Sequence, residues 1–282
     1  MRWMGGRRSE NIEDRRGMGM PVAVGGGIGT IVLIVLALFF GVDPSVILNT
    51  DAPTAPPPAE SPAPSVSPRG GDEMRDFVAT VLADTEDTWG ALFRESGRQY
   101  REPRLVLFNT SVQSACGMAG SATGPFYCPQ DMKVYLDLDF FRALRDRFRA
   151  PGDFAQAYVI AHEVGHHVQR LLGITDRVMA ERQRGGARGN AASVRLELQA
   201  DCLAGVWAYH ADRARHILEE GDVEEALAAA AAIGDDRLQR RAGGRTAPET
   251  FTHGTSEQRV TWFTRGIESG DLRQCDTFGG GV

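Results

Sequence analysis

The stretch AYVIAHEVGHHVQ, residues 157–169, contains the pattern His-Glu-x-x-His within a run of residues of helical periodicity. We predict that it lies on a helix over residues 154–172. His162 and His166 are about one helical turn apart, so both imidazoles project from the same face at a spacing that suits one metal ion. Glu163 follows the first histidine, where its carboxylate can reach a water beside the metal. This stretch therefore predicts a metal site on a long helix.

A second acidic pattern follows on the next long helix, which we predict over residues 191–216. The stretch LELQAD, residues 196–201, places Glu197 and Asp201 one helical turn apart. Hydrolytic zinc sites usually have three protein ligands and an open position, so Glu197 is the candidate third ligand. Asp201 can accept the free ring N–H of a metal-bound histidine. The alternative for both residues is a charged helix face in solvent.

The N-terminal part of the chain differs in composition from the rest. Residues 1–20 are polar and rich in arginine, residues 21–42 carry no charge, and residues 43–72 are rich in proline. The uncharged stretch is long enough to cross a membrane as a helix, and the arginines before it predict a cytoplasmic N-terminus. We therefore predict a cytoplasmic segment, a single-pass anchor in the plasma (inner) membrane, a linker, and a folded domain over residues 73–282 in the periplasm or exterior. A cleaved signal peptide is the alternative.

Composition also limits the class of partner. The chain has 282 residues and a formal net charge of −6. This acidic balance argues against a nucleic-acid partner, which would require a basic face. The sequence shows no internal repeats, and its length suits one large domain or two small ones.

Four cysteines permit two disulfides in a domain outside the cytoplasm. Cys116 and Cys128 bracket a glycine-rich loop and are the preferred pair, which leaves Cys202 with Cys275. The alternative is four buried free thiols, because a free cysteine packs like a small apolar residue. No Cys-x-x-Cys spacing occurs, so a cysteine zinc site is not expected.

The remaining patterns predict an α+β domain, with a small sheet beside the helices that carry the site. Apolar residues recur at helical spacing over residues 74–93, and short strands are predicted at 105–108 and 133–139. Residues 175–192 are polar and glycine-rich, which indicates a loop or lid. An alanine-rich helix is predicted over residues 222–233. The predicted helix boundaries are Asp153 and Asp222 as N-caps and Gly173 as a stop.

These motifs resemble a known family. His-Glu-x-x-His followed by a helical Glu-x-x-x-Asp resembles the gluzincin peptidases. The strings AYVIAHEVGHHVQ and LELQADC resemble more narrowly the bacterial neutral zinc metallopeptidases of the YpfJ type. So do MRW at residues 1–3, GPFYCP at 124–129 and FTHGTS at 251–256. The resemblance extends from the N-terminus to near residue 275, except for the proline-rich linker. It implies a zincin-like fold, one membrane anchor, Zn²⁺ as cofactor and a peptide or protein substrate.

The resemblance also implies a role in the reaction for each of these residues. Zinc on His162, His166 and Glu197 would activate a water toward the peptide bond. Glu163 would be the general base for that water, and Asp201 would orient a histidine ligand.

A second donor beside the metal is needed for the oxyanion. His253, in the string FTHGTS, is the candidate, and a histidine that caps a surface loop is the alternative. Weaker rivals are Tyr135 and Tyr209. The other histidines receive no catalytic role: His167 is expected to pack or to support a ligand, His210 faces away, and His216 is exposed.

Three functional classes remain. The first is a zinc-dependent metalloendopeptidase, the second is a zinc hydrolase of another amide such as a cell-wall peptide, and the third is a non-catalytic zinc-containing scaffold. Glu163 favours an enzyme, because a scaffold needs no general base. We expect substrate to bind along residues 134–138 as a sheet edge, unless this strand is interior. The large aromatic residues Tyr158, Trp207, Phe140 and Phe141 are expected in the core.

Overall fold

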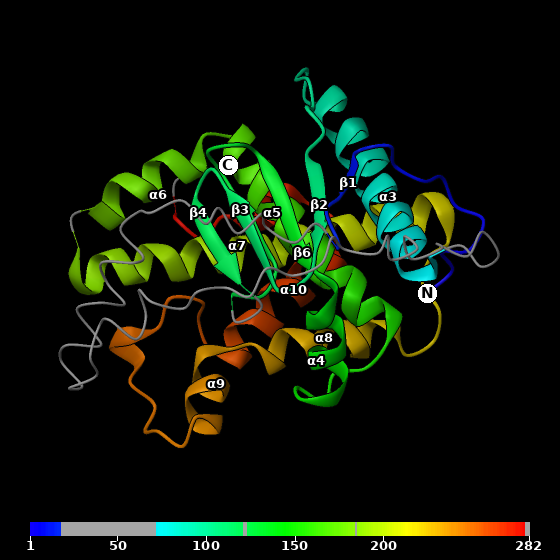
Figure 1. Cartoon of the computed structure of the whole chain (residues 1–282). Coiled ribbons are helices and arrows are strands. Elements are labelled where there is room, and N and C mark those ends of the chain that lie inside the picture. The colour runs from blue at the N-terminus through cyan, green and yellow to red at the C-terminus, as the bar shows by residue number, and fades with distance from the viewer. Residues whose placement is uncertain (18–71, 121–122, 184, 280–282) are drawn as a thin grey trace, which may run out of the picture. The chain divides into compact units, whose positions relative to one another are not determined.

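The fold is described from a computed structural model over residues 1–17, 72–120, 123–183 and 185–279. Its centre is a four-stranded mixed sheet with the strand order β1-β2-β6-β5 (Figure 1). β1 and β6 run parallel to β2, whereas β5 runs antiparallel to β6. The strands are β1 (Ile12–Asp14), β2 (Arg104–Phe108), β5 (Phe126–Cys128) and β6 (Lys133–Asp137).

Both strands predicted from the sequence are present, but β6 is shorter than predicted. It ends at Asp137, whose side chain accepts a hydrogen bond from the backbone N–H of Asp139 and so starts helix α4 (Leu138–Asp146). The prediction that residues 134–138 form a sheet edge is wrong, because β6 is paired on both sides. The outer strand on this side of the sheet is β5.

The first 17 residues belong to the folded unit, which comprises Met1–Gly17 and Asp72–Val282. β1 pairs with β2, and the amino group of Met1 lies 2.6 Å from Asp153 and 3.2 Å from Asp222. The sequence analysis separated residues 1–20 from the domain, and the structure does not keep that separation for residues 1–17. The physical reason is that a parallel strand pair and a buried ion pair join distant residues without any local periodicity.

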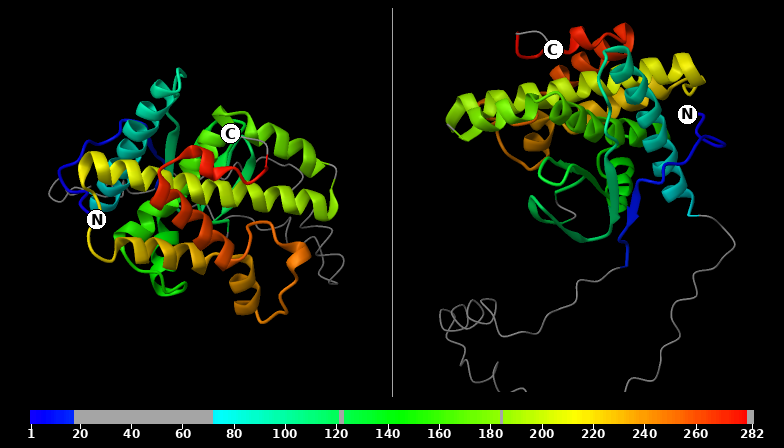
Figure 2. Two further views of the ribbon diagram at one scale, coloured as in Figure 1. Left: turned by 180° about the vertical axis from the view of Figure 1, so that it is seen from behind. Right: turned by 90° about the horizontal axis from the view of Figure 1, so that it is seen from above.

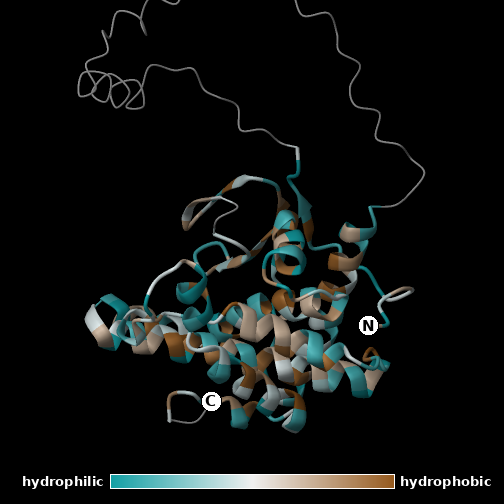
Figure 3. Ribbon diagram, turned by 90° about the horizontal axis from the view of Figure 1, so that it is seen from below, coloured by the Kyte–Doolittle hydropathy of each residue, from teal (hydrophilic) through white to brown (hydrophobic). Residues whose placement is uncertain are grey.

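Helices gather on one side of the sheet (Figure 2), and apolar and polar residues alternate along them (Figure 3). The four predicted helices are confirmed, and in the described part of the chain three further α-helices besides α4 were not predicted. The confirmed helices are α3 (Glu73–Glu95), α5 (Asp153–Leu171), α7 (Gly186–Arg215) and α8 (Asp222–Ala232). The others are α6 (Ile174–Gln183), α9 (Asp235–Arg241) and α10 (Ser256–Ser269).

The region 175–192, predicted as a loop or lid, is mostly helical and this prediction is wrong. It contains most of α6 and the first turns of α7. Ile174, Val178 and Ala192 form a buried apolar cluster that joins the two helices. This packing outweighs the weak helix propensity of the glycines, which is a local preference of only about 1 kcal/mol per residue.

Two predicted N-caps serve a different purpose. Asp153 and Asp222 are the first residues of α5 and α8, each preceded by a glycine at the N-cap, and both accept hydrogen bonds from the Met1 amine. The predicted stop at Gly173 is confirmed. Its φ of +75° is one that glycine adopts without strain.

Small residues let the helices at the site approach closely. A Cβ on Gly165 of α5 would lie 3.0 Å from the carbonyl oxygen of Ala200 on α7. A Cβ on Gly205 of α7 would lie 2.3 Å from the carbonyl oxygen of Phe263 on α10. α7 therefore lies tightly between α5 and α10, and side chains of all three helices can meet.

Both predicted disulfides are confirmed. Cys116–Cys128 joins the turn between β3 (Ser111–Ser114) and β4 (Gly117–Gly120), an antiparallel hairpin, to β5. Cys202–Cys275 joins α7 to the short 3₁₀ helix η2 (Leu272–Cys275). The predicted anchor, residues 21–42, and nearly all of the linker lie outside the described residues. None of the described helices has the length and hydropathy of a membrane span.

Candidate metal centre

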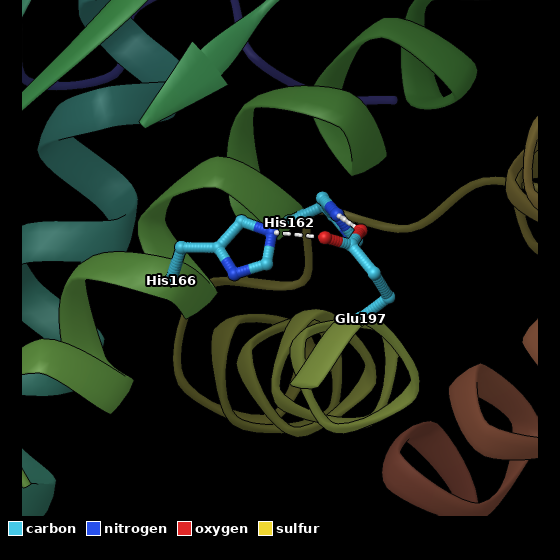
Figure 4. Close-up of side chains that lie close together, drawn as sticks. All are labelled: His162, His166 and Glu197. Atoms are coloured by element: carbon cyan, nitrogen blue, oxygen red, sulfur yellow. Dashed lines mark hydrogen bonds and ion pairs between the residues drawn. The ribbon is translucent and has the colours of Figure 1, made fainter. Parts of the chain in front are cut away.

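Two helices bring three side chains with metal-binding atoms to one point. α5 carries His162 and His166 on one face, and α7 carries Glu197. Nε2 of His162 lies 3.2 Å from Oε2 of Glu197, and Nε2 of His166 lies 3.5 Å from Oε1 (Figure 4). One donor atom of each residue lies within 4.8 Å of the other two. The structure thus brings together the three residues that the sequence predicts as ligands.

Each histidine is oriented by a hydrogen bond to its other ring nitrogen. Nδ1 of His162 lies 2.8 Å from Oδ1 of Asp201, as the helical spacing predicted. Nδ1 of His166 lies 2.9 Å from Oε1 of Gln169, a partner that the sequence analysis missed. Because both acceptors are oxygens, they favour the proton on Nδ1 and direct the Nε2 lone pairs toward Glu197.

This donor set fits zinc, since two imidazoles and one carboxylate leave a further position open in catalytic zinc sites. The imidazoles and carboxylates of the site also attract one another when the imidazoles are protonated. Burial lowers the pKa of His162, but the hydrogen-bonded carboxylates of Asp201 and Glu197 outweigh it and raise the pKa to about 9. Burial raises the pKa of Glu197, but His166 and His162 hold it well below its usual range. A metal ion binding here competes with the proton of His162.

Asp201 is the centre of a buried network that reaches a third helix. Its carboxylate accepts hydrogen bonds from the Tyr158 hydroxyl at 2.5 Å and from Nε and Nη2 of Arg259, on α10, at 2.8 Å. Burial raises the pKa of Asp201, but the charges of Arg259 and His162 outweigh it and lower the pKa to about 2. The carboxylate therefore stays ionised and keeps the proton of His162 on Nδ1.

The sequence analysis did not find Arg259 and gave Tyr158 only a core position. Tyr158 is buried as predicted, but its hydroxyl belongs to the site. Its position one turn before His162, on the same helix face, was the available signal. Arg259 has no such signal, because it comes from a helix that the sequence did not reveal. Gln169 could have been found from its spacing of three residues from His166.

Gln169 extends this outer layer of hydrogen bonds. Its amide nitrogen donates to the carbonyl oxygen of Leu196 at 2.7 Å and to Oε1 of Gln199 at 3.1 Å. Gln199 in turn donates to the carbonyl oxygen of Cys275, a member of the second disulfide. The orientation of His166 thus depends on α7 and on the disulfide-bonded end of the chain.

The three residues lie on the wall of an open cavity of about 1110 Å³, and Glu163 lines the same wall. Glu163 is buried, and burial raises the pKa of its carboxyl group above the usual range. A carboxylate with a raised pKa accepts a proton more readily, which suits a general base. The cavity also has apolar walls, which include the aromatic residues Phe126, Tyr127, Phe140 and Phe148.

The predicted donor, His253, lines this cavity, whereas its rivals Tyr135 and Tyr209 do not. Nδ1 of His253 lies 3.1 Å from Oδ1 of Asp235, and the backbone N–H of His253 donates to Oδ2 of the same residue at 2.6 Å. This hydrogen-bonded carboxylate raises the pKa of His253. The Asp235 partner leaves Nε2 as the free ring nitrogen.

The remaining histidines lie outside the cavity, in agreement with the sequence analysis. His167 is fully buried, with Nε2 2.6 Å from the carbonyl oxygen of Arg101 and Nδ1 3.1 Å from the Tyr127 hydroxyl. His210 contacts the carbonyl oxygen of Gly270, and His216 is exposed.

Comparisons with known proteins agree with this site. A family model described as "Putative neutral zinc metallopeptidase" matches residues 1–278. The chain is 48% identical over 290 residues to the uncharacterised protein YpfJ of Escherichia coli (strain K12), and the match covers 99% of both chains. It is 43% identical over 254 residues to the uncharacterised protein Rv2575 of Mycobacterium tuberculosis (strain H37Rv), covering 86% of this chain and 85% of the relative. No solved structure matches the chain significantly. The chain therefore belongs to the neutral zinc metallopeptidase family, which implies zinc as its cofactor.

Proposed function

We propose that the protein is a zinc-dependent endopeptidase that hydrolyses peptide bonds in the cavity beside His162 and His166. The observation that carries this proposal is the convergence of two imidazoles and the Glu197 carboxylate next to the buried Glu163. A zinc ion held by the three donors would polarise the substrate carbonyl and lower the pKa of a water. The chain's own residues supply the remaining chemistry.

Glu163 would take the proton of the attacking water and deliver it to the leaving amine. Burial raises the pKa of Glu163, which brings its carboxylate closer to the basicity that this transfer needs. His253 would donate a hydrogen bond from Nε2 to the carbonyl oxygen as negative charge develops there. Asp235 supports this role because it orients the ring and favours its protonated form.

The outer strand β5 would align an extended substrate. β5 pairs with β6 on one side, and Phe126 and Tyr127 of β5 line the cavity. A peptide that adds to the free side of a strand gains backbone hydrogen bonds independently of its sequence. This would hold the scissile bond near Glu163 while the aromatic walls select side chains.

We also propose that residues 21–42 attach the protein to a membrane, with the catalytic unit outside the cytoplasm. Support comes from the uncharged length of that stretch and from the two disulfides, which form in oxidising compartments. Residues 1–17 and 72–282 belong to one unit. While they pack together, both must lie on the same side of the membrane, unlike in the predicted single-pass topology.

Exposed methionines allow this topology to be measured. Met4 and Met118 are 82% and 59% exposed, and the four cysteines are disulfide-bonded, so Met4→Cys or Met118→Cys adds a lone thiol. We expect a membrane-impermeant maleimide to label both variants in spheroplasts, whose plasma membrane is intact. Labelling of Met118→Cys but not of Met4→Cys would support the cytoplasmic N-terminus predicted from the sequence. Labelling of neither would contradict a unit outside the cytoplasm.

The activity is tested with the full chain, zinc and a mixed peptide library read by mass spectrometry. Glu163→Gln removes the proposed base and keeps the three metal donors. Glu224→Gln is the matched control, because Glu224 is an exposed residue of α8 that does not line the cavity. We expect cleavage by wild type and control, and none by Glu163→Gln or after chelation. Equal cleavage by Glu163→Gln and wild type would refute the proposed mechanism.

A further inference from the structure

Four arginines form a positively charged rim, of which Arg147 and Arg241 line the cavity, while the charges of Arg149 and Arg237 act on Arg241. Arg147 and Arg149 follow the end of α4, and Arg237 and Arg241 belong to α9. We propose that this arginine rim binds acidic side chains of the substrate, so that the enzyme selects acidic peptides. This inference rests on the proposed peptidase function and specifies the substrate class of the same cavity.

The rim is built around one aromatic ring. Arg241 donates hydrogen bonds to the carbonyl oxygens of Arg147 at 3.3 Å and Phe148 at 3.2 Å. The guanidinium carbons of Arg241 and Arg147 lie 5.5 and 6.0 Å from the centroid of the Phe148 ring. Arg147, Phe148 and Arg241 all line the cavity that contains His162 and Glu163. The positive charge is therefore part of the wall that a bound substrate would face.

These arginines are not neutralised by carboxylates. Within the described part of the chain, no ion pair joins any of the four to an acidic residue, although neighbouring arginines are paired: Arg142 with Asp139, Arg145 with Asp146, and Arg240 with Asp236. Arg241 is exposed, but slight desolvation and the charges of Arg237, Arg149 and Arg147 lower its pKa. A ligand carboxylate would relieve this mutual repulsion.

The contrast with the rest of the molecule favours an acidic ligand. The chain carries a net charge of −6, so a local positive cluster is against the general trend. The carboxylates that line the same cavity are Glu163 and Glu197 at the metal centre and Asp139, which is paired with Arg142. A guanidinium binds a carboxylate through two parallel hydrogen bonds, which gives direction as well as attraction.

Apolar residues beside the rim narrow the substrate further. Phe140, Ala143 and Leu238 line the cavity next to the arginines. An acidic side chain flanked by an apolar one would satisfy both surfaces. A peptide fits this combination better than a nucleic acid or a phosphate group, because the site combines separate charged and apolar contacts along a wall that ends at the metal centre.

The test measures binding, and therefore does not depend on turnover. The full chain with Glu163→Gln, loaded with zinc, is titrated with fluorescent peptides that differ only in carrying Glu or Gln at each position in turn. We expect the Glu peptide to bind at least tenfold more tightly at one or more positions at low salt, and this advantage to shrink as salt is added.

Reversal or removal of single rim charges then shows which arginines cause the preference for Glu peptides. Arg147→Glu and Arg241→Gln should each reduce the advantage of the Glu peptide about tenfold, with little change for the Gln peptide. Arg145→Glu and Arg240→Gln are matched controls, because both arginines are exposed, ion-paired and outside the cavity lining. Thermal unfolding checks that each variant is folded. Equal binding of Glu and Gln peptides to the parent protein, or an advantage that survives in both rim variants, overturns the inference.

Two further outcomes distinguish a substrate surface from catalytic failure and from a membrane contact. If wild type cleaves no peptide but the Glu163→Gln protein still prefers acidic peptides through the rim, the substrate surface stands and the proposed activity falls. Vesicles of anionic phospholipid provide the second comparison. If the rim variants lose vesicle binding but not peptide preference, the rim is a membrane contact and the inference is wrong.

Discussion

Arg259 on α10 donates two hydrogen bonds of 2.8 Å to the two carboxylate oxygens of Asp201 on α7. Both side chains are buried, and Asp201 also accepts the hydrogen bond that orients His162. The ion pair therefore joins three helices directly behind the metal centre. A fully buried charge is stable only with its partner, because no water can solvate the charge when the partner is removed.

The first prediction concerns this pair. Arg259→Met should leave the Asp201 carboxylate uncompensated and reduce the free energy of unfolding by about 3–5 kcal/mol. It should also weaken zinc binding at least tenfold, measured by competition with a chromogenic chelator. Arg265→Met, at an exposed position of the same helix, is the control. Unchanged zinc affinity in a folded Arg259→Met protein would show that Asp201 orients His162 without help.

The second prediction concerns Gln169, which orients His166. Gln169→Leu removes the acceptor for Nδ1, so the ring can rotate or change tautomer. We expect zinc affinity to fall by roughly 10- to 100-fold, the range typical for such supporting residues. Gln156→Leu is the control on the same helix, since Gln156 contacts the carbonyl oxygen of Gly152 and does not contact the site. Equal zinc affinities in the two variants would contradict the assigned role.

The third prediction separates His253 from a residue that only caps a loop. His253→Phe should lower kcat about 100-fold, with KM and zinc content nearly unchanged, because the donor acts on charge that develops during the reaction. His216→Phe, at an exposed position, serves as the control. A fall in kcat of less than threefold would leave His253 with the structural role alone, through its contact with Asp235.

The fourth prediction is a dependence of stability on pH through His167. Burial lowers the pKa of His167 to about 4, against about 6.5 in an unfolded chain. Between these values the unfolded state binds a proton that the folded state does not. The free energy of unfolding should therefore fall as pH decreases from 6.5 to 4, by roughly 3 kcal/mol for this group.

Denaturant unfolding from pH 7 to pH 4, with the metal chelated throughout, measures this effect. His167→Gln keeps a donor and an acceptor but does not titrate, so its loss of stability over this range should be smaller than that of the wild type. The exposed His216→Gln should behave as the wild type. If His167→Gln and wild type lose the same stability, the pKa of His167 is not depressed.

The fifth prediction concerns residues 1–17. A chain cut to residues 72–282 loses β1 and the Met1 amine, which exposes the edge of β2 and leaves Asp153 and Asp222 close together without their cation. We expect it to unfold at a lower temperature and to aggregate. Joining residue 17 to residue 72 through a short Gly/Ser linker should restore stability. A short linker is long enough because the ion pair between Arg16 and Asp72 shows that the two ends lie close together. Equal melting temperatures of the 72–282 chain and the full chain would show that β1 contributes little to stability.

Helical spacing in the sequence identified the candidate residues of the metal centre, whereas the packing of α5 against α7 brings them together. His162, Glu163 and His166 could be predicted because a helix places positions one turn apart on one face, and the same rule linked Glu197 to Asp201. The Cys116–Cys128 disulfide and the termination of α5 before Gly173 also follow from local signals, whereas Cys202–Cys275 was predicted only because those two cysteines remained.

Tertiary structure alone decided the features that depend on distant residues. Arg259 supports Asp201 only because α7 and α10 pack closely at Gly205, and β1 joins the sheet only through pairing with β2. The region 175–192 is mostly helical because Val178 and Ala192 are buried together with Ile174, despite the glycines of the region. Periodicity reports which face of an element is apolar, whereas the partner of that face is set by packing between segments far apart in the chain.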